Sequence, residues 1–177
     1  MTQRLAHDHG ELSQVLDQIL PALVAGEINR AHELLDLFWA RLAVHIRAEH
    51  LHLFPAILNA LGGVGTVDDN RKPTLAQAES AIAELRSDHN FFMHELSLAV
   101  RGLRDLPQTS NRQTAAAQTA SVSAAVLAVT ERLAAHNELE ETQVYPWAEE
   151  LLSAPEQVKL AARINDELTN MPARFDT

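Results

Sequence analysis

Cysteine is absent from the sequence, and glycine is rare, with 6 residues in 177. Without cysteine the protein has no disulfide bonds, thiolate nucleophiles or cysteine-ligated iron–sulfur clusters. The few glycines, together with a hydrophobic content of 46% that is rich in alanine and leucine, favour a mainly helical protein. At this length we expect a single domain over residues 1–177 that is large enough to bury a hydrophobic core.

The sequence also lacks targeting and membrane signals. The N-terminal segment MTQRLAHDHG has no apolar core of the kind found in signal peptides, and no hydrophobic run approaches the length of a membrane span. The formal net charge of −10 argues against nucleic acid or an anionic membrane as the principal partner. No phosphate-binding loop or nucleophile triad is recognisable. We therefore expect a soluble cytoplasmic protein.

Four long segments carry hydrophobic residues at the 3.6-residue period of a helix. They cover approximately residues 2–24, 27–61, 74–106 and 112–152. Turn-forming residues at 62–73 (GGVGTVDDNRKP) separate the second segment from the third, and LPQTSN separates the third from the fourth. Four antiparallel helices with such connections predict an all-α fold, an up-down-up-down four-helix bundle over residues 2–152.

A short additional helix is predicted after the bundle. Ser153, Pro155 and Glu156 resemble a capping box with proline at the first helical position. This start signal predicts a helix to about residue 168, within a C-terminal segment that covers residues 153–177.

Every helical segment has an inward-facing stripe of apolar residues that is interrupted by ionisable side chains. Steps of three and four residues place six of them on these stripes: His9, His45, Glu49, His89, His136 and Glu140. A buried imidazole or carboxylate without a partner costs several kcal/mol, so six of them in one core need a compensating interaction. A metal centre provides it, because His and Glu four residues apart lie on one helix face, about 6 Å apart along the axis.

Taken singly, these features have simpler explanations. An inward-facing histidine is usually a hydrogen-bonded core residue, and an isolated HxxxE segment is usually a surface ion pair. This chain has two such segments, HIRAE at residues 45–49 and HNELE at residues 136–140, and two further histidines on the other two helices. The combination favours two cations at the centre of the bundle, bridged by the glutamates and flanked by the imidazoles.

The remaining histidines are weaker candidates. Three of them are expected to point away from the stripes: His7, His32 and His50. His52 lies on the same face as His45, so it is either an additional ligand or a group that hydrogen-bonds to a ligand. His94 could reach the site only from a distorted helix. Asp8 and Asp88 directly precede the first and third histidines of the set, as either exposed charges or hydrogen-bond partners near the site.

The two HxxxE segments, closed by Phe54-Pro55 and Tyr145-Pro146, resemble the hemerythrin-like (HHE cation-binding) family. The resemblance covers about residues 5–152. It implies a four-helix bundle around a non-haem diiron centre, with two Fe ions joined by an oxo or hydroxo bridge; Mn and Zn are possible substitutes by ligand type. It also implies the roles of the six residues: terminal ligands His9, His45, His89 and His136, and bridging ligands Glu49 and Glu140.

Two departures separate this chain from the oxygen-carrying hemerythrins. Those proteins have a second histidine one turn after the first on the third helix, where this chain has Met93. They also place the fourth-helix carboxylate five positions after its histidine, whereas Glu140 follows His136 by four. Both features resemble the divergent bacterial hemerythrin-like proteins. The resemblance then implies an open coordination position, which favours reactivity over reversible storage of dioxygen.

Three functions remain open at this point. The expected function is binding of, or reaction with, O2, peroxide or NO at the diiron centre, for sensing, buffering or detoxification. One alternative is an enzyme that decomposes peroxide in a catalase-like cycle, and another is a metal-free structural bundle that interacts with an unknown protein partner. Four imidazoles carry less negative charge than the carboxylate-rich sites of ferritin-like proteins, so we expect the ferrous state to be relatively favoured and reactive.

Overall fold

The computed structural model describes residues 2–62, 72–106 and 111–175, and all regular elements in these ranges are helices. The four long helical stretches are α1 (Gln3–Val24), α2 with η1 and α3 (Ile28–Ala48, Glu49–Leu53 and Phe54–Gly62), α4 (Leu75–Asp105), and α5 with η3 and α6 (Arg112–Leu139, Glu140–Val144 and Tyr145–Leu151). The predicted all-α, up-down-up-down bundle is confirmed. Most of the predicted connection at 62–73 and most of the LPQTSN segment lie outside the described residues.

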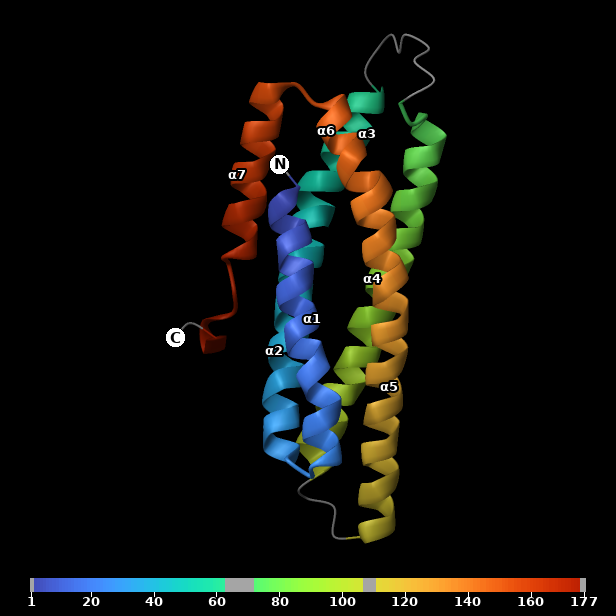
Figure 1. Cartoon of the computed structure of the whole chain (residues 1–177), viewed down its shortest axis with the longest axis vertical. Coiled ribbons are helices and arrows are strands. Elements are labelled where there is room, and N and C mark those ends of the chain that lie inside the picture. The colour runs from blue at the N-terminus through green and yellow to red at the C-terminus, as the bar shows by residue number, and fades with distance from the viewer. Residues whose placement is uncertain (1, 63–71, 107–110, 176–177) are drawn as a thin grey trace.

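The helices form a ring in which sequence neighbours run antiparallel (Figure 1). α1 packs on α2, and α4 packs on α5. Contacts between α2 and α4 and between α1 and α5 close the ring. Residues from all four stretches therefore face one another across a single long core.

Local sequence signals explain where several helices begin and end. α1 ends before Gly26, whose φ of 75° lies in the left-handed region that stops a helix. α4 begins after Thr74, whose hydroxyl accepts a hydrogen bond from the N–H of Gln77 in a capping box. The capping box predicted at Ser153 and Glu156 is present, so the predicted start of the last helix is confirmed.

The apolar core consists of two clusters of buried side chains. On α1, Leu5 belongs to one cluster and Leu12 to the other, and on α4 Leu85 and Phe92 are divided in the same way. A buried histidine lies in the sequence between the two members of each pair. A polar layer therefore separates the two apolar clusters, at the level of the predicted ligands.

α7 (Ala154–Leu168) packs along the outside of the bundle against α2 and η1 (Figure 1). Its buried side chains are Leu160, Ile164 and Leu168. Glu167 forms an ion pair with Arg47 of α2, and the short turn η4 (Ala173–Phe175) follows. Both apolar burial and charge therefore attach α7 to the bundle.

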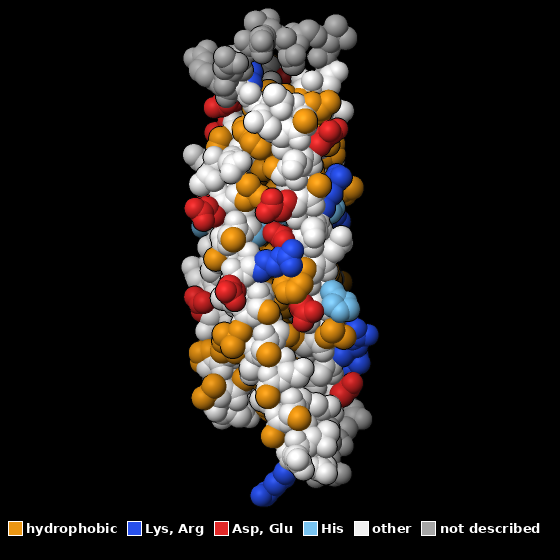
Figure 2. Space-filling view, turned by 90° about the vertical axis from the view of Figure 1, so that its right-hand side faces the viewer, with side chains coloured by type: hydrophobic (Ala, Val, Ile, Leu, Met, Phe, Trp, Pro, Cys, Tyr) orange, Lys and Arg blue, Asp and Glu red, His pale blue; other side chains and the backbone are white. Residues whose placement is uncertain are grey.

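The face formed by α4 and α5 carries acidic and basic side chains scattered among hydrophobic and neutral ones (Figure 2). The large hydrophobic side chains that are exposed come from several different helices and include Val24, Leu51, Leu98, Leu127 and Val158. Scattered residues of this kind are ordinary on a protein surface. Within the ranges that the structure describes, no helix is both long and apolar enough to cross a membrane.

Candidate metal centre

The structure brings the six predicted residues together in the polar layer. They are His9 on α1, His45 on α2, Glu49 at the start of η1, His89 on α4, His136 on α5 and Glu140 at the start of η3. None of the six is more than 6% exposed, and both glutamates are fully buried. The inward direction predicted for these side chains from the helical period is therefore the direction they take.

The four imidazoles approach one another in two pairs. The Nε2 atoms of His9 and His45 are 3.2 Å apart, and those of His89 and His136 are 3.1 Å apart. Adjacent ligands of one octahedral metal ion are about 3 Å apart when the bonds are about 2.1 Å long. Each pair therefore fits one metal position, and we name them the His9–His45 position and the His89–His136 position.

Glu140 reaches both positions with different oxygens. Its Oε2 lies 3.2 Å from Nε2 of His9, and its Oε1 lies 3.1 Å from Nε2 of His136. Potential ligand atoms within 4.8 Å of one another form two groups that share this residue: His9, His45 and Glu140, and Glu49, His89, His136 and Glu140. Glu140 thus has the placement of a bridging carboxylate.

Glu49 also spans the two positions, with Oε1 3.5 Å from Nε2 of His45 and Oε2 3.4 Å from Nε2 of His89. Two buried oxygens, Oε2 of Glu49 and Oε1 of Glu140, have no hydrogen-bond partner. An unsatisfied buried acceptor costs about 1–3 kcal/mol, and more when it carries charge. Cations between the imidazole pairs would satisfy both oxygens, so this donor set fits two metal ions.

The outer nitrogen of His45 is fixed by a carboxylate that is itself fixed by an arginine. Nδ1 of His45 donates to Asp8 at 3.0 Å, and Arg41 donates to the other oxygen of Asp8 at 2.7 Å. Burial alone would raise the pKa of Asp8, but His45 and Arg41 outweigh it and lower the pKa. A proton on Nδ1 leaves the lone pair of Nε2 free for a cation.

Asp88 repeats this arrangement in the other half of the bundle. Nδ1 of His136 donates to Asp88 at 3.2 Å, and Arg132 donates to the other oxygen at 2.6 Å. Both Asp8 and Asp88 are buried. Of the two alternatives open from the sequence, hydrogen-bond partner of the site is therefore correct for both aspartates.

The outer nitrogens of the other two imidazoles have different partners. Nδ1 of His9 lies 2.7 Å from a carboxylate oxygen of Glu141, and Nδ1 of His89 lies 2.9 Å from Nε2 of His50. The expectation that His50 points away from the site is therefore wrong. Glu141, which the pattern did not identify, directly follows Glu140 in the sequence, just as His50 follows its own glutamate.

Two π-helical turns explain why the residues that follow the glutamates also contact the cluster. η1 and η3 both begin at the glutamate of an HxxxE segment. The N–H of Phe54 donates to the carbonyl of Glu49, and the N–H of Tyr145 donates to that of Glu140, five residues back in each case. Successive side chains diverge less in direction in this wider turn than in an α-helix. The residue after each glutamate can therefore contact an imidazole of the cluster, as His50 and Glu141 do, although Glu141 is 45% exposed.

A proline follows each π turn and supplies a local reason for it. Pro55 and Pro146 have no N–H, and a proline ring clashes with the carbonyl four residues back in a regular α-helix. A wider turn before the proline relieves that contact. The aromatic–proline pairs were therefore a usable signal for the distortion.

Tyr145 is a second member of the site that the sequence pattern did not identify. Its buried hydroxyl donates to Oε1 of Glu49 at 2.9 Å, and it lies 3.2 Å from both Oε2 of Glu140 and Nε2 of His9. The pattern used this residue only as the aromatic that closes an HxxxE segment. Its place five residues after Glu140, at the end of one π turn, is the signal that would have identified it.

Burial and the neighbouring carboxylates act in opposite directions on the imidazoles. Burial lowers the pKa of His45, but Glu49 and Asp8 outweigh it and raise that pKa from 6.5 to about 10. At His89 burial dominates, and the pKa falls from 6.5 to about 2. At His136 burial again lowers the pKa, but Glu140 outweighs it and raises the pKa. His45 and His89 therefore differ most, with His45 protonated and His89 neutral in the metal-free protein.

The two glutamates of the cluster also have pKa values that are shifted in opposite directions. Burial and the charge of Glu140 raise the pKa of Glu49. Burial acts in the same direction on Glu140, but the neighbouring imidazoles of His136 and His9 outweigh it and hold that pKa well below its usual range. Bound cations would replace the protons that these groups share. Metal binding is therefore linked to proton release.

The other histidines of interest lie outside the cluster. His52 lies 3.6 Å from Glu167 of α7, so it is not an additional ligand. His7 and His94 are exposed on α1 and α4, as expected for His7. Met93 packs against one apolar cluster and does not contribute to the polar layer.

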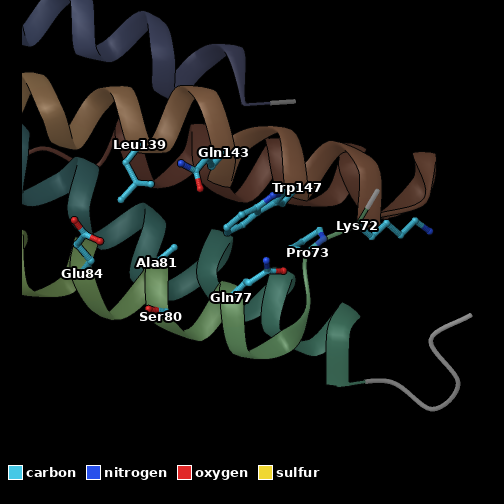
Figure 3. A pocket seen from close by; sticks show the side chains of 9 residues that line it. All are labelled: Lys72, Pro73, Gln77, Ser80, Ala81, Glu84, Leu139, Gln143 and Trp147. Carbon is cyan, nitrogen blue, oxygen red and sulfur yellow. The ribbon is translucent and has the colours of Figure 1, made fainter. Parts of the chain in front are cut away.

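Two neighbouring cavities between α4 and the α5–α6 stretch lie near the level of the cluster. The larger has a volume of about 500 Å³ and is lined by Glu84, Leu139 and Trp147 among others, but by none of the six predicted ligands (Figure 3). The second, of about 350 Å³, shares Glu84 and Leu139 with the first and is also lined by Asp88 and His136. This second cavity therefore reaches the outer side of one imidazole of the cluster.

Comparison with known proteins gives one match. A family model described as the hemerythrin HHE cation-binding domain matches residues 1–148, which covers the bundle as far as the middle of α6 and does not include α7. No curated protein and no solved structure matches the chain.

Proposed function

Since the chain belongs to the hemerythrin HHE cation-binding domain family, we propose that its buried cluster holds two iron ions that bind or react with O2, peroxide or NO. One observation carries the proposal: the Nε2 atoms of the four histidines converge, while each Nδ1 atom has a side-chain partner that is not itself one of the six ligands. The outside partners are Asp8, Asp88, Glu141 and His50. Metal-ligating histidines typically have such partners, which fix the tautomer and orient the ring.

The ligand assignment follows the two groups of donor atoms. His9 and His45 would hold one ion, and His89 and His136 the other. Glu49 and Glu140 would bridge them, because each directs its two oxygens to different positions. These six residues are the terminal and bridging ligands that the family resemblance implies.

The composition of the donor set favours iron. Imidazole and carboxylate ligands suit Fe, Mn, Zn or Co. A structural zinc site is commonly a closed tetrahedral set around one ion, whereas this set is divided between two positions that share carboxylates. When bound, two iron ions supply the electrons that reduction of O2, peroxide or NO requires. The protein residues hold the ions, fix their ligands and exclude bulk water.

Burial of the cluster limits the size of the molecule that reacts. The ligand side chains are at most 6% exposed, so only a molecule of a few atoms reaches the cluster without opening the bundle. The cavity lined by Asp88 and His136 offers such a molecule a path to the outer side of the cluster. Diatomic gases and hydrogen peroxide fit this restriction.

The test is spectroscopic. Iron-loaded protein is reduced in the absence of oxygen, and absorbance spectra are recorded after separate additions of O2, H2O2 and NO. We expect a change in the iron spectrum with at least one of the three. The matched control is His7→Ala, which alters an exposed histidine and should behave as the unmodified protein. No spectral change with any of the three molecules would contradict the proposed reactivity.

The same experiment separates the alternative functions. A stoichiometric, reversible change indicates a binding or sensing protein. Steady oxygen evolution from peroxide indicates a catalase-like enzyme. A metal-free form that is as stable and as well assembled as the iron-loaded form indicates a structural bundle, with the polar layer serving only to specify packing.

We also propose that residues 1–177 fold as one domain. α7 lies outside the family match, yet it buries three apolar side chains against the bundle and pairs through Glu167 with Arg47 and His52. Deletion of α7 should therefore lower the stability of the whole bundle. A single cooperative unfolding transition of the full chain, monitored by circular dichroism and by tryptophan fluorescence, would support one domain.

A further inference from the structure

We propose that Tyr145 is a fifth protein ligand of the ion at the His9–His45 position, which leaves the His89–His136 position as the one that binds the exogenous small molecule. The inference rests on the proposed function, because it requires two cations in the cluster. It adds a phenol oxygen to the set of ligands and assigns the open coordination position to one of the two ions.

The hydroxyl of Tyr145 lies among the donor atoms of the His9–His45 position. It is 3.2 Å from Nε2 of His9, 2.9 Å from Oε1 of Glu49 and 3.2 Å from Oε2 of Glu140. These separations match that between Nε2 of His9 and Oε2 of Glu140, which is 3.2 Å. Atoms about 3 Å apart have the spacing of neighbouring ligands on one metal ion. The phenol oxygen therefore has the placement of a donor.

The ring of Tyr145 is fixed in this orientation. It is 3% exposed and stacks on the imidazole of His9, with ring centroids 5.8 Å apart and an angle of 23° between the planes. The residue begins α6 directly after the π turn, so the backbone hydrogen bond to Glu140 also holds it. A fixed ring presents its oxygen to the cluster without a further loss of rotamer freedom on metal binding.

The other half of the bundle has no such oxygen. Phe54 follows Glu49 by the same number of residues as Tyr145 follows Glu140. Its ring stacks on His89 in the matching way, with centroids 6.2 Å apart and an angle of 13°. The His89–His136 position thus receives imidazole nitrogens and carboxylate oxygens alone, and it retains more room for an added ligand.

The chemistry of a phenol fits this role once cations are present. Burial and the two carboxylates raise the pKa of Tyr145 well above 10, so the hydroxyl of the metal-free protein is protonated. Ferric iron reverses this preference, and phenolate is a known type of ferric ligand. If iron binds there, the phenol would release its proton to solvent in exchange for the bond to iron, and no electron would be transferred.

The test is the visible and resonance Raman spectrum of the diferric protein. Tyr145→Phe removes the phenol oxygen and keeps the ring. We expect the unmodified protein to show a phenolate-to-iron charge-transfer band with enhanced phenolate vibrations. Both should be lost in Tyr145→Phe while its iron content stays at two ions per chain. Because Tyr145 is the only tyrosine of the chain, a diferric unmodified protein with two iron ions and no phenolate band would overturn the assignment.

The matched variant is Phe54→Tyr, which places a phenol at the equivalent point of the other half. It should add a second phenolate contribution. It should also prevent azide, used as a probe, from giving its charge-transfer band, because the added oxygen fills the open position. Azide should still bind to Tyr145→Phe. Azide binding that survives unchanged in Phe54→Tyr would show that the open position belongs to the other ion.

Iron content separates the two levels of the inference. A protein that binds no iron overturns the proposed function and the ligand assignment together. A protein that binds two iron ions but gives no phenolate signal overturns the ligand assignment alone. Far-UV circular dichroism of each variant shows that the bundle has folded, so a lost signal can be attributed to the altered side chain.

Discussion

The two halves of the bundle, α1 with α2–α3 and α4 with α5–α6, supply nearly the same side chains to the two metal positions. In both halves, an aspartate accepts hydrogen bonds from an arginine and from an imidazole: Asp8, Arg41 and His45 in the first, and Asp88, Arg132 and His136 in the second. In both, a glutamate begins a π turn that ends before an aromatic–proline pair. The repeated parts are those that build a metal position.

The halves differ at two places, and both differences surround the same imidazole pair. Nδ1 of His9 has the carboxylate of Glu141 as its partner, whereas Nδ1 of His89 has the imidazole of His50. The hydroxyl of Tyr145 adds an oxygen at the His9–His45 position, whereas Phe54 adds none at the other. More negative charge is thus directed at the His9–His45 position. The differing parts are those that would make two bound ions chemically distinct.

The largest expected effect tests the feature that the halves share. Glu49→Gln and Glu140→Gln keep the side-chain volume and remove a bridging charge. Each variant should lose affinity for both ions by more than about 100-fold. Loss of a group that only hydrogen-bonds to a ligand already lowers metal affinity about 10–100-fold. Elemental analysis and calorimetric titration with Zn²⁺ measure this loss.

The control for the bridging variants is Glu131→Gln, an exposed carboxylate on α5. It should bind metal as the unmodified protein does. Loading with two ions in both Glu49→Gln and Glu140→Gln would refute the assignment of bridging ligands.

The next effect tests whether the aspartates that hydrogen-bond to the ligand imidazoles contribute equally in the two halves. Asp8→Asn and Asp88→Asn remove the charge that holds an imidazole and should each weaken metal binding about 10–100-fold. Because the two aspartates have the same partners at similar distances, the two losses should agree. A loss confined to one variant, measured by the same titration, would show that one half alone determines affinity.

A smaller effect tests where the halves differ. Glu141→Gln replaces a charged partner of His9 by a neutral one and should weaken binding at the His9–His45 position about tenfold. His50→Gln replaces one neutral partner of His89 by another and should change affinity by much less. Titration of both variants with Zn²⁺, resolved into two binding steps, measures the difference. Equal losses would remove the evidence that the two positions differ in charge.

The smallest effect concerns the pH dependence of the metal-free protein. The pKa of His45 is raised from 6.5 to about 10, so its contribution to stability is present below pH 6.5 and is lost as the pH rises toward 10. The pKa of His89 is lowered from 6.5 to about 2, so its contribution is present above pH 6.5 and is lost as the pH falls toward 2. His45 and His89 therefore contribute to the pH dependence in opposite directions.

Urea unfolding of the metal-free protein measures this contrast. His45→Gln should flatten the pH dependence of the unfolding free energy on the alkaline side of 6.5, and His89→Gln on the acid side. One proton changes that free energy by at most about 1.4 kcal/mol per pH unit. Flattening on the same side in both variants would contradict the opposite pKa shifts.

The helical period was sufficient to predict the bundle and to bring the six residues together. Ionisable side chains on an otherwise apolar stripe are a strong signal, because burial without a partner is costly. The direction of Asp8 and Asp88 could not be predicted, since it depends on arginines of the neighbouring helices. The position of an aspartate next to a histidine in the sequence does not show which arginine of a neighbouring helix it will contact.

His50 and Tyr145 were missed for a different reason. The prediction assumed the constant rotation of an α-helix, and both residues lie in or directly after a π turn. That turn redirects the side chains that follow each glutamate. The proline that accompanies each turn is visible in the sequence, but its effect on direction becomes clear only when the backbone is known.

The most direct measurement is a crystal structure of the iron-loaded protein with anomalous scattering recorded at the iron edge. We predict two peaks in the polar layer, one beside His9 and His45 and the other beside His89 and His136. Both should contact Glu49 and Glu140. A single peak, peaks outside this layer, or these side chains turned away from the bound iron would contradict a shared two-metal centre.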